Sequence, residues 1–394
     1  MMILAHQIRL VPTVAQEVYL RRACGTARFV WNWALAEWNR LYEAGEKPNG
    51  NELKKRFNVI KYEQFPWLHE IHRDAHSQPF ANLQSAFVSF FKKKTKHPKF
   101  KKKGYHDTFY VANDRVDFDN QRINLPKVGW VKTREKLRFD GKIMNATVRR
   151  IANSWFVIVQ VDVGEFHKPK TGNETIGVDL GIKTTATLST GEKIDGPKAL
   201  NKYQKRMVRL SRIHARRTKG SNNRAKSAMK LARLHHRISY IRQDFLHKLT
   251  TRLCRENQTV VIEDLHVKGM LRNHSLAKAI SDEGWSELRR QLSYKAIVYG
   301  TEVVVADRWF PSSKRCSTCG TVKRELLLSE REFVCETCGV VLDRDVNAAM
   351  NLKQLGRVTP EVTPVEMEAL ARPRGRVKLP SLKQELYREH LCLQ

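Results

Sequence analysis

The sequence predicts a multidomain protein that combines an α/β domain with a separate antiparallel β unit. The chain has 394 residues, too many for one ordinary core, so roughly two to four domains are expected. Residues 105–165 alternate apolar and polar side chains, as half-buried strands do. After residue 175, short apolar runs alternate with segments of helical periodicity, the pattern of an α/β domain. Four cysteines in two close pairs indicate a small metal-binding module near the end of this second region.

The charge balance points to a polyanionic partner. Lysine and arginine together number 72 against 40 acidic residues, which gives a formal net charge of +32. Such a charge opposes compaction through self-repulsion, and nucleic acid is the first candidate to offset it. An anionic membrane surface is the weaker candidate, because no apolar run approaches the ~20 residues that span a bilayer. The N-terminus lacks the apolar stretch and cleavage site of a secretory signal, and the paired cysteines fit a reducing compartment.

Residues 11–104 predict a helical region with a strongly basic end. Thr13 and Gln16 have the spacing of a capping box, which places a helix start there, and Gly25 could divide the following helix into two. A later amphipathic helix, SQPFANLQSAFVSFF, leads into a block from Lys92 to Lys103 that contains eight lysines and no acid. A charge run is usually only a solvated face. Eight like charges in twelve residues repel one another, however, so a phosphate backbone is the expected contact.

The rest of the chain predicts strands first and then a mixture of strands and helices. Residues 105–165 are expected to form an antiparallel unit that closes into a small barrel. Two or three strands follow at 175–195, and then a helical hairpin at about 199–256, in which the stretch from Lys202 to Lys248 carries fifteen Lys or Arg and one acid. The remaining elements are expected in the order strand QTVVIEDL, helix 285–299, strand TEVVVADRWF, cysteine region, and a last helix from about Asp345. The tail from Gly356 shows little periodicity and is expected to be mostly disordered.

The two CxxC pairs predict a structural zinc site. Cys316 and Cys319 form the first pair and Cys335 and Cys338 the second, with fifteen residues between the pairs. Four thiolates at this spacing suit tetrahedral zinc, and the glycine after each pair eases a tight turn. All four ligand positions are then protein thiolates, so none is open to water and the chemistry is expected elsewhere. Disulfides or a chance pairing are the weaker explanation.

Three acidic residues are the candidates for that chemistry. Asp179 lies in the apolar strand IGVDLG, Glu263 ends the apolar run VVIE, and Asp345 begins the last predicted helix. A buried carboxylate needs a compensating partner, and in so basic a chain two magnesium ions held between the three acids would supply it. Two such ions about 3.5–4 Å apart can stabilise both the attacking and the leaving oxygen of a phosphodiester. An acid on the first strand, another after a later strand and a third on the final helix is the order of an RNase H-like nuclease.

The motifs around these residues resemble those of one family. GVDLGIK, IEDL, FPSSKRCSTCG, CETCG and DRDVNAAMNL occur in this order, and together they resemble TnpB, the protein encoded beside the transposase in small bacterial insertion sequences. The resemblance extends over residues 5–355. It implies a metal-dependent, RNA-guided DNA endonuclease related to type V CRISPR effectors. A guide RNA from the end of the element itself would pair with target DNA, and cleavage would occur beside a short flanking motif.

The resemblance also implies a domain order. The expected fold is a β-barrel-like unit with a helical insert, followed by an RNase H-like nuclease domain of the RuvC type with an inserted four-cysteine zinc finger. The corresponding segments are the β-barrel-like nucleic-acid-binding unit, 1–10 and 105–168; the helical recognition insert, 11–104; the nuclease domain, 172–315 and 339–355; the zinc finger, 316–338; and a disordered tail, 356–394.

Residue by residue, the resemblance places the catalytic triad on Asp179, Glu263 and Asp345. Two nearby acids could be confused with these three. Asp264 follows Glu263, and neighbours on a strand point to opposite faces, so only one of the two should reach a metal. Asp343 precedes Asp345, the ligand position, by two residues. It would contact either a residue of the triad, without binding the metal itself, or the zinc finger.

The zinc ligands implied by the resemblance are Cys316, Cys319, Cys335 and Cys338, and all four positions match. The residues implied to contact nucleic acid are Gln78, Lys92, Lys93, Lys94, Lys101, Lys102, Lys103 and Arg344. For Arg344, a contact with the scissile phosphate and a surface salt bridge are equally compatible with the sequence. The basic hairpin at 199–256 is a further candidate for phosphate contacts.

Two other functions compete with guided cleavage. The chain could be a DNA-binding accessory or regulator of transposition that does not cut, although a pure binder needs no buried acidic triad. It could also be a transposase that performs strand transfer with the same acids, although the guide-type N-terminal region disfavours this. In the leading interpretation the protein acts in the bacterial or archaeal cytoplasm, associated with the nucleoid, with Mg²⁺ for catalysis and one structural Zn²⁺. The guide, the target site and the oligomeric state do not follow from the sequence.

Overall fold

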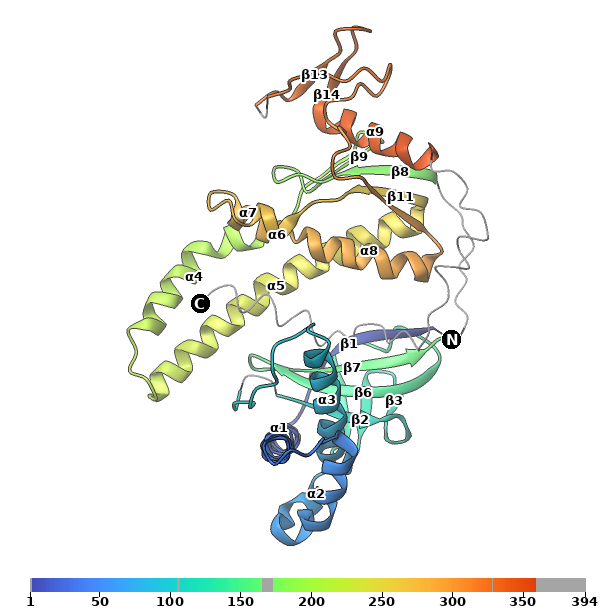
Figure 1. Cartoon of the computed structure of the whole chain (residues 1–394). Coiled ribbons are helices and arrows are strands. Elements are labelled where there is room, and N and C mark those ends of the chain that lie inside the picture. The colour runs from blue at the N-terminus through green and yellow to red at the C-terminus, as the bar shows by residue number, and fades with distance from the viewer. Residues whose placement is uncertain (1, 105–106, 165–172, 328, 359–394) are drawn as a thin grey trace. The chain divides into compact units, whose positions relative to one another are not determined.

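A computed structural model describes residues 2–104, 107–164, 173–327 and 329–358 (Figure 1). The described residues fall into two compact units. The first unit comprises Met1–Thr171, Asp195–Glu256 and His266–Thr301, and the second comprises Gly172–Ile194, Asn257–Leu265 and Glu302–Gln394. The division into five segments drawn from the sequence stays a prediction, and its tail lies outside the described residues beyond position 358. None of the described helices is long and apolar enough to cross a membrane.

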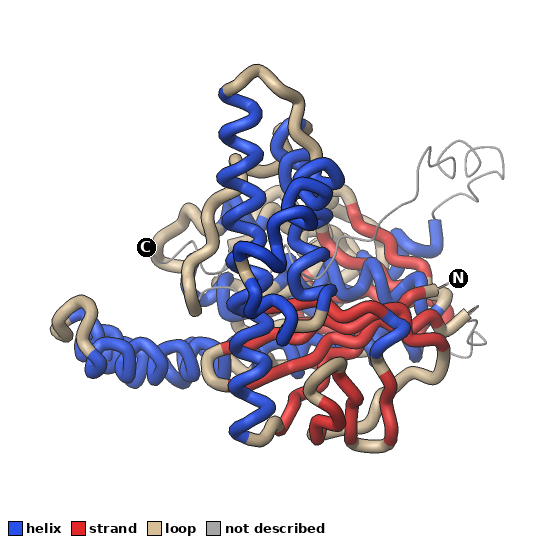
Figure 2. Tube along the Cα trace, turned by 90° about the horizontal axis from the view of Figure 1, so that it is seen from below, coloured by secondary structure: helices blue, strands red, loops and turns tan. Residues whose placement is uncertain are grey.

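A seven-stranded antiparallel sheet forms the centre of the first unit. Its strands are β1 (Ile3–Val11), β2 (Thr108–Ala112), β3 (Asp117–Asp119), β4 (Arg122–Leu125), β5 (Gly129–Thr133), β6 (Lys142–Ile151) and β7 (Ser154–Asp162), in the order β2-β6-β7-β1-β5-β4-β3. The strands lie side by side in Figure 2. Alternate residues such as Ile8, Val111 and Val157 fill one core, which explains the period of two in the sequence. The antiparallel pairing predicted for 105–165 is confirmed, whereas closure into a barrel stays a prediction.

The helices between β1 and β2 pack around a second, aromatic-rich core. They are α1 (Val14–Glu43), α2 (Gly50–Gln64), the short 3₁₀ helix η1 (Pro66–Glu70) and α3 (Arg73–Phe91). The capping box predicted at Thr13 and Gln16 is confirmed, with hydrogen bonds of 3.0 and 3.3 Å. The expected division at Gly25 is wrong, because α1 continues through it. A glycine inside a helix costs only about 1 kcal/mol, and buried residues on both sides of Gly25 hold this helix in place.

A long helical hairpin and three shorter helices complete the first unit. The hairpin consists of α4 (Ala199–Ala215) and α5 (Asn222–Glu256), and α6 (Val267–Met270), α7 (Ala277–Glu283) and α8 (Trp285–Tyr299) follow later in the chain. Gly284 joins α7 to α8 with a φ of +71°, and a Cβ there would lie 3.1–3.2 Å from the Arg242 and Leu246 side chains of α5. Glycine therefore permits both the left-handed backbone and the close packing of this bend.

The second unit is a mixed five-stranded sheet with one helix against it. Its strands are β8 (Asn173–Asp179), β9 (Ala186–Leu188), β10 (Lys193–Ile194), β11 (Asn257–Glu263) and β12 (Glu302–Ala306), in the order β10-β9-β8-β11-β12. β8, β9 and β10 are antiparallel, whereas β8, β11 and β12 run parallel. The helix is α9 (Arg344–Val358), and a two-stranded ribbon of β13 (Glu332–Val334) and β14 (Val341–Asp343) lies just before it (Figure 1).

Candidate functional site

The three predicted catalytic acids lie at the ends of elements in the second unit. Asp179 is the last residue of β8 and Glu263 is the last residue of β11. These strands are parallel neighbours with Val178 paired to Ile262, so both carboxylates emerge at the same edge of the sheet. Asp345 is the second residue of α9.

Burial and neighbouring charges shift the pKa values of Asp179 and Glu263. Burial raises the pKa of Asp179 well above its ordinary value, the carboxylates of Glu263 and Asp345 raise it further, and Arg344 opposes the rise. Burial also raises the pKa of Glu263, against a hydrogen bond from Ser312 that lowers it. Mutual repulsion of this kind favours a bound cation.

The placement of Asp345 depends on how closely α9 approaches β8. A Cβ at Gly177 would lie 2.0 Å from the carbonyl oxygen of Ala349 and 2.5 Å from the backbone nitrogen of Lys353. The helix backbone thus rests directly on the strand, two residues from Asp179. Ala348 and Ala349, both buried, keep this face of the helix small.

Asp343 caps α9 with its side chain. Its Oδ1 accepts hydrogen bonds from the backbone N–H groups of Asp345 and Val346, both at 3.1 Å, which is the geometry of an N-cap. Its Oδ2 accepts from Lys193 Nζ at 2.6 Å. Burial favours a higher pKa for Asp343, but the hydrogen bonds from Lys193, Val346 and Asp345 outweigh it and hold the pKa below the usual value. The cap fixes the first turn of the helix, and Asp345 lies in that turn.

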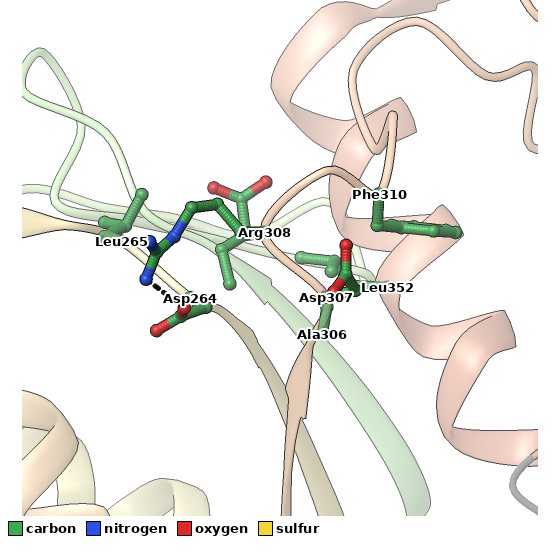
Figure 3. Close-up of a pocket in the computed structure, with 8 residues that line it drawn as sticks. Asp264, Leu265, Ala306, Asp307, Arg308, Phe310 and Leu352 are labelled. Carbon is green, nitrogen blue, oxygen red and sulfur yellow. Dashed lines mark hydrogen bonds and ion pairs between the residues drawn. The ribbon is translucent and has the colours of Figure 1, made fainter.

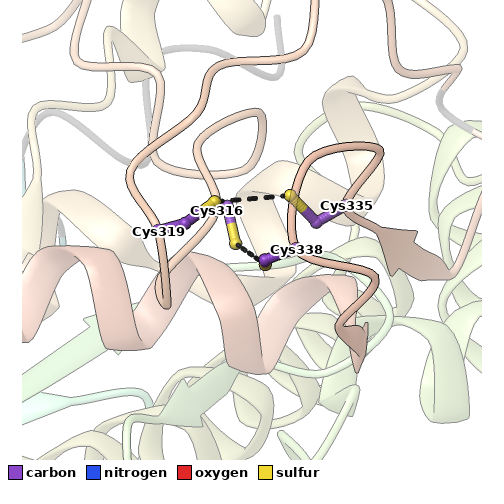
Figure 4. Close-up of side chains that lie close together, drawn as sticks. All are labelled: Cys316, Cys319, Cys335 and Cys338. Carbon is purple, nitrogen blue, oxygen red and sulfur yellow. Dashed lines mark hydrogen bonds between the residues drawn. The ribbon is translucent and has the colours of Figure 1, made fainter.

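The four predicted zinc ligands converge on one point (Figure 4). The sulfurs of Cys316 and Cys338 are 3.7 Å apart and those of Cys319 and Cys335 are 3.5 Å apart, and all four lie within 4.8 Å of one another. Four thiolates at ~2.3 Å from a tetrahedral zinc ion would be separated by about 3.8 Å, so the arrangement fits this ion.

The two halves of this cluster repeat one backbone pattern. The N–H of Gly320 donates to the carbonyl of Cys316 at 3.0 Å, and the N–H of Gly339 donates to that of Cys335 at 3.0 Å. Both glycines have a positive φ, of 80° and 70°. A glycine in that position lets the chain turn around the sulfurs, as the sequence predicts for each CxxC pair.

Amide side chains of α9 connect the first cysteine pair to the helix that carries Asp345. Asn347 accepts from the backbone N–H of Ser317 at 2.9 Å and donates to the carbonyl of Arg315 at 2.7 Å. Asn351 donates to the carbonyls of Ser312 and Arg315 at 2.8 and 2.6 Å. Both asparagines are fully buried. They therefore hold the segment 312–317 against one face of α9.

Ser312 links this segment to Glu263. Its hydroxyl donates to Glu263 Oε1 at 2.5 Å, so the serine orients one carboxylate while its carbonyl accepts from Asn351. The sequence contains the signals for these contacts in FPSSKRCSTCG and in the i, i+4 asparagines of NAAMN. Without the fold, however, nothing in the sequence indicates that the two motifs meet.

A small cavity of about 60 Å³ opens beside Glu263 at the ends of β11 and β12. It is lined by Glu263, Asp264, Leu265, Ala306, Asp307, Arg308, Phe310 and Leu352. Asp264 forms an ion pair with Arg308 at 2.6 Å (Figure 3). This contact gives Asp264 a partner other than a metal, which is consistent with the different roles predicted for the two adjacent acids.

The predicted nucleic-acid contacts of the first unit occupy α3 and the chain after it. Gln78 lies on α3, with its amide 3.4 Å from Asn82 Oδ1. Lys92, Lys93, Lys94, Lys102 and Lys103 are exposed, and Lys101 is partly buried. Asn32 on α1 bonds the backbone of Lys101 at both its N–H and its carbonyl, at 2.7 and 3.0 Å, and Trp31 donates to the carbonyl of Lys99 at 3.1 Å. The lysine block is thus fastened to a helix by its backbone.

Arg344 lies in the second unit and is already engaged. Its guanidinium donates to the carbonyl of Leu327 at 2.9 Å and to that of Glu330 at 3.4 Å. Its backbone N–H donates to the carbonyl of Arg331 at 2.8 Å. These contacts tie the start of α9 to the segment between the cysteine pairs, and a contact with the scissile phosphate stays a prediction.

Three family models match the chain. A model described as "Probable transposase" (OrfB, IS605 type) matches residues 157–274, the model of a Cas12f1-like TNB domain matches 285–352, and one of a helix-turn-helix domain matches 1–47. Over residues 3–43 the structure shows a strand, β1, followed by one long helix, α1.

Relatives resemble the chain over most of its length. A "Putative RNA-guided DNA endonuclease" from Streptomyces pristinaespiralis is 41% identical over 361 residues, which cover 89% of each chain. The "Putative RNA-guided DNA endonuclease InsQ" of Escherichia coli K12 is 34% identical and covers 89% of this chain and 92% of its own. A cryo-EM structure of a Cas12f1–sgRNA–target DNA complex aligns with 86% of this chain and 83% of its own, with a TM-score of 0.53 and 15% identity. At that identity the likeness concerns the mixed α/β fold alone.

Proposed function

Because this chain belongs to the TnpB (OrfB, IS605-type) family, we propose that it is an RNA-guided DNA endonuclease encoded by a transposable element. The observation that carries the proposal is the meeting of Asp179 and Glu263 at one sheet edge, with the charge of Asp345 close enough to raise the pKa of Asp179. The names of the two relatives described above support the same activity. The strand order and directions of the second unit also support an RNase H-like domain of the RuvC type.

The chemistry proposed for this site is hydrolysis of a DNA phosphodiester. Two Mg²⁺ ions bound there would polarise the phosphate and lower the pKa of the attacking water. Carboxylate oxygens are the donors that Mg²⁺ prefers, and the raised pKa of Asp179 marks a site where positive charge is favoured. The protein positions these donors with rigid elements: β8 supports Asp179, Ser312 orients Glu263, and the capped first turn of α9 carries Asp345. Cleavage would leave a 3′ hydroxyl and form no covalent enzyme intermediate.

The four-cysteine cluster is proposed to bind one structural Zn²⁺. With four thiolates as donors, no ligand position remains for a substrate. Zinc would instead fix the two cysteine pairs, and through Asn347 and Asn351 it would fix the segment that leads to Ser312 and the helix that begins at Asp345.

The basic surfaces are proposed to bind the guide RNA and the target DNA through their phosphates. The candidates are Gln78, for the flanking motif, and Lys92, Lys93, Lys94, Lys101, Lys102 and Lys103, for the backbone. The hairpin α4–α5 adds a further strongly basic element. Base pairing with the guide would read the target sequence, so these side chains need only recognise backbone shape and charge.

The test begins with the nucleic acid that the protein carries. The chain would be expressed with its native flanking DNA and purified, and the bound RNA would be sequenced. A single RNA species that ends at the element boundary is expected. The purified complex should then cut matched DNA only in the presence of Mg²⁺. A mixed population of fragments, or bound DNA alone, would contradict the guided function.

Matched variants of two acids make the cleavage assay specific. Asp345→Asn should abolish cleavage, whereas Asp264→Asn, which weakens the ion pair with Arg308, should retain most of it. Binding of matched DNA by Asp345→Asn should persist. If Asp345→Asn cuts as well as the wild-type chain, the cleavage site does not use Asp345 and is built differently from the one proposed. Joined DNA ends in the products would instead indicate strand transfer.

A further inference from the structure

Trp309 extends into solvent from the turn between the end of β12 and Ser312. Its side chain is 85% exposed, the largest exposed fraction among the large apolar side chains of the described residues. A tryptophan offers a large, rigid and apolar surface, and leaving it in water forgoes the free energy of burial. A single exposed aromatic residue can be incidental. The backbone contacts that support this one, and its position three residues before Ser312, which hydrogen-bonds Glu263, give it a specific meaning.

The backbone around Trp309 is held firmly. Asp307 accepts the N–H of Trp309 with Oδ1 at 2.8 Å and the N–H of Phe310 with its carbonyl at 3.0 Å. The flanking side chains are anchored as well. Arg308 pairs with Asp264, as the dashed line in Figure 3 marks, and Phe310 packs against the core that contains Leu352. The indole ring is therefore presented by a fixed turn.

The same turn leads directly to Ser312, the hydrogen-bond partner of a candidate metal ligand. Ser312, three residues after Trp309, donates the 2.5 Å hydrogen bond to Glu263. The residues on both sides of Trp309, Arg308 and Phe310, line the cavity that Glu263 also lines. A nucleic-acid strand whose phosphate lies at the carboxylates would thus have its neighbouring bases near the indole ring.

We propose that Trp309 stacks on an unpaired base of the DNA strand that is being cut and holds that strand against the carboxylates. This inference rests on the proposed nuclease function. Every base has an aromatic face, so such a contact would accept any sequence, as a guided enzyme requires. The faces of bases inside a duplex are covered by their neighbours, so the contact selects single-stranded DNA. The formal charge of +32 favours a polyanion over an apolar protein as the occupant.

The first test measures binding without cleavage. The purified protein–RNA complex carrying Asp345→Asn would be titrated with a short, fluorescent, single-stranded oligonucleotide that is not complementary to the guide. Stacking on an aromatic side chain contributes about 1–3 kcal/mol per base, so Trp309→Ala should weaken binding about 5- to 150-fold. Trp309→Phe should retain most of the affinity. Ile297→Ala, which shortens another strongly exposed apolar side chain, should change nothing.

The second test identifies the base through the substrate. Abasic sites would be placed one at a time along the target strand in an active complex, and cleavage rates would be compared for the wild-type chain and Trp309→Ala. If the ring stacks on one base, removing that base should slow the wild-type complex and have no further effect on Trp309→Ala. If an abasic site at every position slows Trp309→Ala by the same factor as it slows the wild-type complex, the proposal is overturned.

The two proposals fail in distinguishable ways. Equal affinity of Trp309→Ala and the wild-type chain for single-stranded DNA would overturn the stacking contact and leave guided cleavage intact. If the wild-type complex never cuts DNA, the proposed function fails, while the binding measurement still decides whether Trp309 contacts a base.

Discussion

Replacing Gly177 with alanine should move Asp345 without altering any carboxylate. Gly177 lies on β8 where α9 crosses it, and its missing Cβ leaves room for the helix backbone. A Cβ there would be 2.0 Å from the Ala349 carbonyl oxygen and 2.5 Å from the Lys353 nitrogen. Both are main-chain atoms, so no side-chain rotation can relieve the overlap.

The size of the effect follows from these distances. Ordinary contact begins at 3.4 Å, so strand and helix must separate by about 1.4 Å at the point that is now at 2.0 Å. Overpacking of this kind costs roughly 1–3 kcal/mol of stability. Asp345 lies about one turn before Ala349 and should move with it. Misplacing a catalytic group by about 1 Å can reduce a rate about 100-fold, so cleavage should fall by this order.

The assay compares cleavage rate, thermal unfolding and zinc content in Gly177→Ala and a control, Gly25→Ala. A Cβ at Gly25 meets only the Arg28 guanidinium, at 3.7 Å, and the residue lies inside α1. That control should gain about 1 kcal/mol of stability from better helix propensity and cleave normally. Wild-type cleavage together with wild-type stability in Gly177→Ala would refute the claim that this contact positions Asp345.

Three further outcomes follow from the site. Cys335→Ser should lose both zinc and cleavage, which metal analysis and a cleavage assay would measure. Full activity without bound zinc would mean that the zinc finger does not position Asp345. Ser312→Ala should raise the Mg²⁺ concentration needed for half-maximal cleavage about 10- to 100-fold, because it removes the hydrogen-bond partner of Glu263, a proposed ligand. The control Ser313→Ala should leave that concentration unchanged. Equal Mg²⁺ requirements in the two variants would exclude the role given to Ser312. Burial and the neighbouring carboxylates raise the pKa of Asp179, so the folded, magnesium-free protein holds this proton more tightly than the unfolded chain does. Its stability should therefore fall as pH rises from the ordinary carboxyl range through the raised pKa. Asp179→Asn should reduce that fall in thermal unfolding without Mg²⁺, leaving the part that comes from the raised pKa of Glu263, and should abolish cleavage with Mg²⁺. An unchanged pH dependence would contradict the raised pKa of Asp179.

Local features of the protein could be predicted from the sequence because the interactions that form them are local. The capping box at Thr13 joins residues three positions apart, and each CxxC turn is closed by a hydrogen bond within five residues. Alternation of apolar and polar residues likewise shows which segments form a half-buried sheet. It does not show which strands pair, and only the fold places β1 between β5 and β7, more than 100 residues away along the chain.

The candidate site shows the same difference between what the sequence predicts and what only the fold decides. The sequence by itself determined which residues could bind metal, because donor atoms and their spacing are properties of residue type and position. Only the tertiary structure decided how those residues are supported: that Asp343 caps α9, that Ser312 bonds Glu263, and that Asn351 reaches the segment containing Ser312 across 39 positions. It also decided that α1 continues through Gly25. These outcomes depend on packing between distant segments, and a pattern of residues along one chain does not contain the distances between them.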